Sequence, residues 1–275
     1  MIQEKVLIKT NQPYLVFATE KFKQRVIATY GISHFYSYKP TNNVHSDIQL
    51  IPDGCSNIIF AYNANNMEAF VLGSVRKREP ISLDPNREYF GIRFQPGENP
   101  CFAKESVKLF VNGITKLKDF SQMNSLYSGM DQIQSFNERI NTFLQIYNKS
   151  FSSENETKQH NLFRQIYILI VKTKGIITIS ELEKRIGYSA RYINLLFTEK
   201  LGISAKQFSR IIKFQNAVDL INKGYIDNLC NLAEKFEYYD QSHFIHDFKN
   251  FTNKTPSEYI KTIRNSQYRN RVIDV

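Results

Sequence analysis

The chain has 275 residues, more than a single hydrophobic core usually supports, so we expect two domains. With 42% hydrophobic and 23% charged residues, its composition is that of a globular protein and excludes a mainly disordered chain. The net charge of +10 is uneven: residues 1–157 carry 17 Lys and Arg against 15 Asp and Glu, and residues 158–275 carry 19 against 11. This excess favours a polyanionic partner, although basic residues also simply solubilise exposed helices.

Residues 25–97 predict a β-rich region. Five runs of aromatic or β-branched residues are separated by turn residues: Ile32–Tyr38, Ile48–Ile51, Ser56–Tyr62, Ala69–Val75 and Glu88–Gln95. In the last run Phe90, Ile92 and Phe94 alternate with glycine and polar residues, so these three side chains share one face of a strand. Several short strands at this spacing indicate a small β-sandwich or barrel.

Residues 100–150 change to a helical pattern. A stripe of apolar residues at three- and four-residue intervals is formed by Ile133, Phe136, Ile140, Phe143, Leu144 and Tyr147. We expect this stripe to pack on the β-rich region, with a dimer seam as the alternative. A polar stretch near 148–155 then separates an N-terminal domain, residues 1–152, from a C-terminal domain, residues 158–267.

The C-terminal domain is predicted to be all-helical. Its seven expected helices are 154–173, 179–186, 190–200, 205–222, 229–236, 241–251 and 256–265. The capping-box spacing, a hydroxyl residue followed three positions later by Glu or Gln, occurs at Ser153/Glu156, Thr178/Glu181, Ser204/Gln207 and Thr255/Glu258. The expected fold class is therefore α+β and multidomain: a small β-sandwich or barrel with helices, followed by an all-α domain of seven helices.

One spacing occurs twice within this helical domain. Ile193 and Phe197 precede Gly202 and Ser204 at the same intervals at which Phe244 and Phe248 precede Asn253 and Thr255. A short helix and a tight turn come before each copy. The sequence therefore predicts two helix-turn-helix units, residues 179–200 and 229–251, joined by a linker helix at 205–222.

The second helix of each unit has an outer face suited to DNA. In the first unit this face carries Ala190, Arg191, Asn194, Leu195 and Thr198, and in the second it carries Gln241, Ser242, Ile245, His246 and Lys249. Arginine, asparagine and glutamine make paired hydrogen bonds with base edges, whereas lysine suits guanine or phosphate. A linker helix of about 27 Å would set the two outer faces about one turn of B-DNA apart, ~34 Å. We therefore expect these ten residues to contact double-stranded DNA.

The segment Leu182–Ile263 resembles the DNA-binding domain of the AraC/XylS family of bacterial transcription regulators. The resemblance is carried by Ile186–Ser189, Phe197, Leu201–Ser204, Lys213–Ile221, Asp240–Phe244, Phe248, Lys249 and Thr255–Tyr259. It implies that two recognition helices enter successive major-groove segments, and that the protein controls transcription, most often as an activator that contacts RNA polymerase. The chain departs from the family pattern at Glu183, Leu195, Thr198, Lys213 and Glu237. Glu237 stands in place of a turn glycine, so we expect the second turn to be distorted.

The N-terminal domain is similar to a sensory domain that precedes this DNA-binding domain in some relatives. The likeness rests on Ile51–Cys55, Gly73 and Gly91–Gly97. Many relatives carry a cupin-like β-domain that binds an effector or dimerises. Tyr62, Arg76 and Arg93 are candidate contacts for an anionic small-molecule effector, although outward-facing strand positions explain them equally well. His34 and His45 stand alone, so we expect no metal site, and no cofactor is implied.

Other classes of protein have less support. The sequence contains no glycine-rich phosphate loop, nucleophile elbow or paired carboxylates, so we expect no enzyme. Cys55 follows a turn and is a candidate nucleophile or redox sensor, but a structural thiol is the favoured interpretation. The alternative to DNA binding is an effector-binding β-domain protein whose helical half mediates protein-protein interaction. A steep dependence of binding on salt would favour DNA.

We expect a cytoplasmic protein without membrane contact. The longest apolar run, Ile166–Val171, is too short to span a bilayer, and the first residues lack an export signal. Cys55, Cys101 and Cys230 are few and far apart, as in reduced intracellular proteins. The sequence leaves a monomer and a homodimer open.

Overall fold

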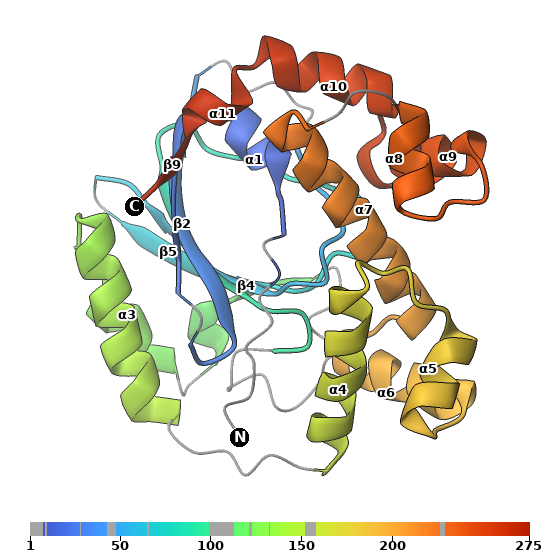
Figure 1. Cartoon of the computed structure of the whole chain (residues 1–275). Coiled ribbons are helices and arrows are strands. Elements are labelled where there is room, and N and C mark those ends of the chain that lie inside the picture. The colour runs from blue at the N-terminus through green and yellow to red at the C-terminus, as the bar shows by residue number, and fades with distance from the viewer. Residues whose placement is uncertain are drawn as a thin grey trace.

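The structure is a computed structural model that describes residues 8, 10–27, 29–42, 48–64, 66–98, 113–120, 123–131, 133–151, 158–225 and 229–275 (Figure 1). The strands are β1 (Thr19–Val26), β2 (Ile32–Pro40), β3 (Gln49–Leu50), β4 (Asn57–Tyr62), β5 (Met67–Leu72), β6 (Glu79–Pro80), β7 (Glu88–Phe94), β8 (Ile114–Lys116) and β9 (Val272–Asp274). The helices are α1 (Pro13–Phe17), α2 (Asn124–Met130), α3 (Phe136–Phe151), α4 (Lys158–Lys172), α5 (Ile179–Ile186), α6 (Ala190–Leu201), α7 (Ala205–Lys223), α8 (Leu229–Lys235), α9 (Gln241–Thr252), α10 (Pro256–Asn265) and α11 (Tyr268–Arg271). The chain is thus β-rich in its first part and helical in its second, as expected.

Seven of the described strands form one sheet, in the order β8-β5-β4-β7-β2-β1-β9. Neighbouring strands run antiparallel, except that β9 lies parallel to β1. The short strands β3 and β6 form a separate pair. Side chains of a strand point alternately to the two faces, so Phe90, Ile92 and Phe94 of β7 share one face, and all three are buried.

This sheet differs from the small β-sandwich or barrel that we expected. The edge strands β8 and β9 do not pair with each other, so the described strands form an open sheet. The two-residue strands β3 and β6 are too short to make a second layer. Helices cover the two faces instead (Figure 1). Alternating apolar residues specify that a face is buried, but they do not specify whether a sheet or a helix covers it.

One face of the sheet packs against α2 and α3. Phe35, Phe60 and Phe90 on this face form a buried cluster with Phe143 and Tyr147 of α3. The rings of Phe35 and Phe143 meet edge to face, with their centroids 5.7 Å apart. The apolar stripe of α3 is therefore occupied by packing within the chain, the interpretation that we favoured, and it does not provide a dimer seam.

The other face packs against α1 and the helices of the C-terminal part. Tyr36 and Leu15 belong to the same hydrophobic cluster as Phe208 and Phe214 of α7. In Figure 1, α7 lies between the sheet and the helices α8 and α9. Helices α5 to α10 begin at the residues that the sequence predicts, and each ends within one residue of the predicted end. Local caps set these ends: Thr178 with Glu181 and Thr255 with Glu258 form complete capping boxes.

A buried glutamine connects α7 to the N-terminal part. The Gln215 side-chain oxygen accepts a hydrogen bond from Asn11 N–H at 2.7 Å. Its side-chain nitrogen donates to the carbonyl oxygens of Asn11 at 3.3 Å and Pro52 at 2.8 Å. Tyr14 adds a hydrogen bond from its hydroxyl to the carbonyl of Thr252 at 2.8 Å. The two parts are therefore joined by directional bonds as well as by apolar packing.

The C-terminal segment returns to the N-terminal sheet, which the sequence did not predict. Strand β9 pairs with β1 so that Val272 lies opposite Phe22 and Ile273 opposite Lys23. Arg271 donates to the carbonyl oxygens of Phe17 and Thr19, both at 2.9 Å. We call residues 268–274 the C-terminal strap, because α11 and β9 fasten the helical part to the edge of the sheet.

Some predicted features lie wholly or partly outside the described residues: the polar stretch near 148–155, the start of the helix predicted at 154–173, the Ser153/Glu156 capping box, His45 and Cys101. Within the described part of the chain, no helix is long and apolar enough to cross a bilayer. The same residues contain no group of three or more His, Cys, Asp or Glu side chains placed to hold a metal ion.

We expect Gln215→Leu to lower the free energy of unfolding of the whole chain by about 3 kcal/mol. The substitution leaves three buried backbone groups without partners, and each unsatisfied group costs about 1–3 kcal/mol. Urea denaturation followed by circular dichroism measures the loss. Gln207→Leu on the same helix is the matched control, because the described residues give this half-buried side chain no hydrogen bond. Equal losses in the two variants would contradict the role of Gln215.

Candidate nucleic-acid interface

The first helix-turn-helix unit consists of α5 and α6. Leu182 of α5 is buried together with Ile193 and Leu196 of α6. Phe197 packs on Phe163 of α4 with the ring centroids 4.9 Å apart. These contacts fix one side of α6 in the core, so its opposite side faces solvent.

The turn before α6 is held by three residues. Gly187 ends α5 with φ at +78°, a left-handed conformation that glycine adopts without strain. The Ser189 hydroxyl accepts a hydrogen bond from Tyr192 N–H at 3.3 Å. The carboxylate of Glu183 accepts one from Ala190 N–H at 2.5 Å. Glu183, a departure from the family pattern, therefore caps the N-terminus of α6, where a negative charge is favourable.

The second unit consists of α8 and α9. Leu232 of α8 is buried with Phe244 and Phe248 of α9. Asp240 caps α9 by accepting a hydrogen bond from His243 N–H at 2.6 Å. Glu237 in the turn has φ at +50°, which costs a residue other than glycine about 1–2 kcal/mol. The turn thus keeps a left-handed residue, and the expected distortion takes the form of strain at Glu237.

An ion pair attaches α9 to the linker helix α7. The guanidinium group of Arg210 donates to both carboxylate oxygens of Asp247, at 2.6 and 3.1 Å. Asp247 is 2% exposed, whereas the Arg210 side chain is 45% exposed. The same hydrogen bonds raise the pKa of Arg210, so the pair stays charged. This pair orients α9, and no local pattern in the sequence predicted it.

The predicted DNA-contacting residues lie on two outward faces. The exposed members are Arg191, Leu195, Thr198, Gln241, Ser242, His246 and Lys249, and the half-buried ones are Ala190, Asn194 and Ile245. The Asn194 side-chain oxygen accepts a hydrogen bond from Ala205 N–H at 3.1 Å. Because this bond caps the start of α7, part of the Asn194 carboxamide serves the fold rather than an open surface.

A pair of aromatic residues beside α6 was also not predicted from the sequence. Tyr188 is 47% exposed, and its ring stacks on that of Tyr192 with the centroids 5.2 Å apart. The two residues lie four positions apart, across the N-terminus of α6. That spacing was the available signal. The pair extends the solvent-facing surface of the first unit with two rings and two hydroxyl groups.

Comparisons with known proteins agree with this geometry. Residues 182–262 match a family model described as a helix-turn-helix domain. A curated relative, the uncharacterised HTH-type transcriptional regulator YtdP of Bacillus subtilis (strain 168), is 20% identical over 179 residues. The match spans 60% of this chain but only 23% of the relative. The matched segment coincides with the part of the chain whose sequence resembles the AraC/XylS DNA-binding domain. That relative is named as a transcriptional regulator and not as an enzyme.

A second family model and two solved structures also match. Residues 27–116 match a family described as a domain of unknown function. The C-terminal domain of AraT, a response regulator from Geobacillus stearothermophilus, has 21% identity and a TM-score of 0.36, covering 38% of this chain and 88% of that one. ToxT from Vibrio cholerae O395 has 13% identity and a TM-score of 0.40, covering 88% of this chain and 98% of that one.

The structure does not bring the three candidate effector residues together. Tyr62 of β4 lies opposite Glu88, and Arg93 of β7 lies opposite Asn57. Because side chains alternate along a strand, Tyr62 and Arg93 point to opposite faces of the sheet. Arg93 is also buried and paired with Asp53 at 2.9 Å.

Arg76 precedes β6 and is half-buried, and it joins neither of these two side chains in a common cavity among those that the structure describes. Cys55 is 1% exposed, and burial, helped by the charge of Asp53, raises the pKa of its thiol. A buried thiol with a raised pKa is a poor nucleophile, in agreement with a structural role.

We expect Asp247→Asn to destabilise the chain by about 1–2 kcal/mol, because it removes the charge that holds Arg210, and because the exposure of Arg210 limits the loss. Urea denaturation measures the change. Asp219→Asn is the matched control on α7: Asp219 pairs with Lys223 at 2.6 Å, but both side chains are more exposed. We expect that control to lose less than about 0.5 kcal/mol. A loss in the control as large as in Asp247→Asn would contradict a specific contribution of the Arg210–Asp247 pair to stability.

Proposed function

We propose that the chain is a sequence-specific DNA-binding transcription regulator that inserts α6 and α9 into successive major-groove segments. The observation that carries the proposal is the pair of capped, outward-facing helices fixed to one linker helix. Helix α7 has 19 residues, so it is about 28 Å long at 1.5 Å per residue. That length approaches the ~34 Å turn of B-DNA, the spacing at which two recognition helices reach the same side of a duplex.

Some of the exposed side chains are suited to base reading and others to phosphate binding. Arg191 near the N-terminus of α6 suits a guanine edge, and Gln241 at the first position of α9 suits an adenine edge. Lys249, on the exposed face of α9 and one turn further on than Ile245, suits phosphate or guanine. The first unit offers mostly Leu195 and Thr198 beside Arg191, so its half of the site tolerates more sequence variation.

The remaining parts of the proposal rest on the family resemblance. The regulator acts as an activator in the cytoplasm and contacts RNA polymerase. The N-terminal part receives a small-molecule effector, which is the role of a cupin-like domain, although it is built on an open sheet. A homodimer stays a prediction, and its interface would lie elsewhere than the stripe of α3. One observation favours the second candidate function, a protein-protein interaction module: two large hydrophobic side chains of the first unit, Leu195 and Tyr188, are 51% and 47% exposed.

Substitutions on the two faces test base reading. With an operator obtained by in vitro selection, we expect Arg191→Ala and Gln241→Ala to weaken operator binding by about 1–3 kcal/mol each while changing binding to random DNA much less. Lys249→Ala should weaken both by similar factors. Fluorescence anisotropy with labelled duplexes gives the affinities, and Lys206→Ala, an exposed lysine at the start of α7, is the control. Equal loss on both duplexes for Arg191→Ala and Gln241→Ala would contradict their assignment to base edges.

Salt dependence separates the two candidate functions. A DNA complex that neutralises about six phosphates should lose roughly a thousandfold in affinity between 50 and 200 mM salt, because bound counterions are released. The same titration with the full chain and the selected duplex measures the slope. A flat dependence, or no selected duplex at all, would favour a helical half that binds protein through Tyr188 and Leu195.

A further inference from the structure

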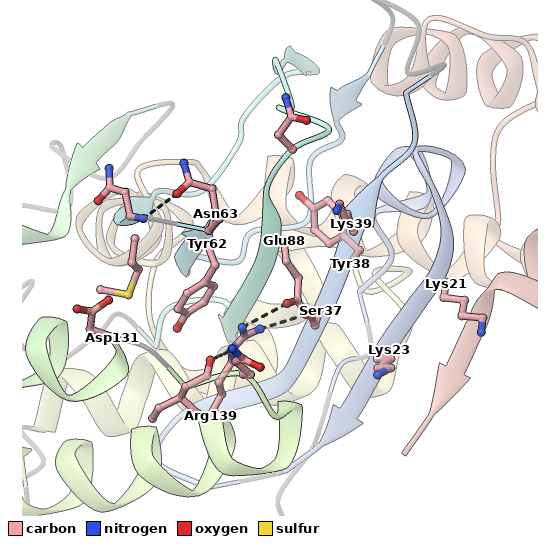
Figure 2. A pocket seen from close by; sticks show the side chains of 16 residues that line it. Lys21, Lys23, Ser37, Tyr38, Lys39, Tyr62, Asn63, Glu88, Asp131 and Arg139 are labelled. Carbon is pink, nitrogen blue, oxygen red and sulfur yellow. Dashed lines mark hydrogen bonds and ion pairs between the residues drawn. The ribbon is translucent and has the colours of Figure 1, made fainter.

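A cavity of about 800 Å³ lies at one end of the sheet face that carries α3. Its walls come from β1, β2, β4, β7 and the N-terminal end of α3, as Figure 2 shows. Cavities of this size hold ligands from small metabolites to nucleotides. It lies on the opposite face of the sheet from α1 and α7, so it is remote from the faces of α6 and α9 that we assign to DNA (Figure 1).

The cavity carries an excess of positive charge. Lys21 and Lys23 of β1, Lys39 of β2 and Arg139 of α3 line it, against the two carboxylates of Glu88 and Asp131. All three lysines are exposed, and among the described residues none has a carboxylate within ion-pair distance. In Figure 2, Lys21 and Lys23 extend from β1 on one side and Arg139 reaches in from α3 on the other.

The floor of the cavity is a buried arginine. The side chain of Arg139 is 3% exposed and donates to the carbonyl of Ile133 at 2.7 Å and to Glu88 Oε2 at 3.2 Å. Its guanidinium lies 3.9 Å from the centre of the Tyr62 ring. The remaining nitrogen, Nη1, is 3.1 Å from Glu88 Oε1 but makes no hydrogen bond of acceptable geometry. One buried nitrogen of Arg139 is therefore without a hydrogen bond, although its charge stays paired with Glu88.

Ser37 completes the polar floor. Its hydroxyl donates to Glu88 Oε1 at 2.9 Å, so the Glu88 carboxylate is shared between Ser37 and Arg139. The Glu88 carboxylate fixes the orientation of Arg139. The three lysines supply the positive charge that exceeds the negative charge of the cavity. A neutral ligand would gain nothing from the charge of these lysines, whereas an anion with several oxygens would pair with them.

We propose that this cavity binds a small polyanion, a metabolite that carries at least two carboxylate or phosphate groups. Of the three candidate effector residues, Tyr62 belongs to this site. Arg139, whose stripe of neighbours led us to treat α3 only as a packing element, replaces Arg93 as its buried cation. The lysines of β1 and β2 hold the outer charges of the ligand.

The site has a physical connection to the helical part of the chain. Lys21 and Lys23 stand on β1, and the other edge of β1 pairs with β9 of the C-terminal strap, where Lys23 lies opposite Ile273. A ligand that draws the β1 lysines toward Arg139 also acts on the strand to which the strap is fastened. Occupancy therefore changes the affinity of the chain for its operator, a consequence that rests on the proposed function, whereas binding of the ligand does not.

Isothermal titration calorimetry of the full chain tests the site, with citrate as the carboxylate probe, pyrophosphate as the phosphate probe and glycerol as the neutral control, all at constant ionic strength. We expect saturable binding of citrate, pyrophosphate or both, and none of glycerol. The variant K21Q/K23Q/K39Q should lose about tenfold or more in affinity. The matched control K77Q/K116Q/K118Q removes three exposed lysines from the same part of the chain, outside this cavity, and should keep the wild-type affinity.

Two results would overturn the site: no saturable binding of either polyanion, or the same loss in both triple variants, since the latter indicates diffuse attraction to a basic protein. Anisotropy with the selected operator tests the connection. A saturating concentration of the probe should change the operator affinity of the wild type at least about threefold and should not change the operator affinity of K21Q/K23Q/K39Q. No change in the wild type would overturn the coupling. If the chain binds no DNA, the proposed function fails while calorimetry still decides the site.

Discussion

The burial of α7 on several sides is the constraint on which the rest of this structure depends. Ile211, Ile212 and Phe214 are almost wholly inaccessible to solvent, and each such side chain contributes about 1.5–3 kcal/mol when it leaves water. The approach of neighbouring elements is close: a Cβ atom added to Gly175, before α5, would lie 2.2 Å from the carbonyl oxygen of Ser209. A helix packed in this way cannot tilt without opening voids in both parts of the chain.

Because α7 packs in a core that both parts of the chain contribute to, the two parts are not independent domains joined by a flexible linker. The sheet supplies Tyr36 and α1 supplies Leu15 to the cluster that also holds the helix-turn-helix units together. Gln215 and the C-terminal strap add directional bonds across the same boundary. Undocking the helical part would expose this apolar surface, so a change in the N-terminal part would reach α6 and α9 through small shifts of a continuous core rather than through domain separation.

The sequence predicts features that short segments decide by themselves. The starts of α5 to α10 follow from caps such as Thr178 with Glu181, and the buried side of α3 follows from its own periodicity. The open sheet, the pairing of β9 with β1 and the Arg210–Asp247 pair require partners far away in the chain, and no local pattern specifies them. Tyr62 and Arg93 illustrate the limit: both stand on strands, but which face each occupies depends on the register between β4 and β7.

Rigidity of α7 also explains how two unequal units can serve one binding site. The second unit offers Gln241 and Lys249 on a helix that the Arg210–Asp247 pair fixes to α7, whereas the first offers Arg191 beside the uncharged Leu195 and Thr198. In the proposed complex with DNA, once the second unit is bound, α7 would hold the first unit at the next groove with little further loss of orientational freedom. Contacts of α6 that are too weak to hold DNA alone then add to the affinity. Binding of the second unit has already removed most of the translational and rotational freedom of the chain relative to the DNA. A weakly charged α6 is therefore compatible with specific binding only as long as α7 remains clamped by the sheet.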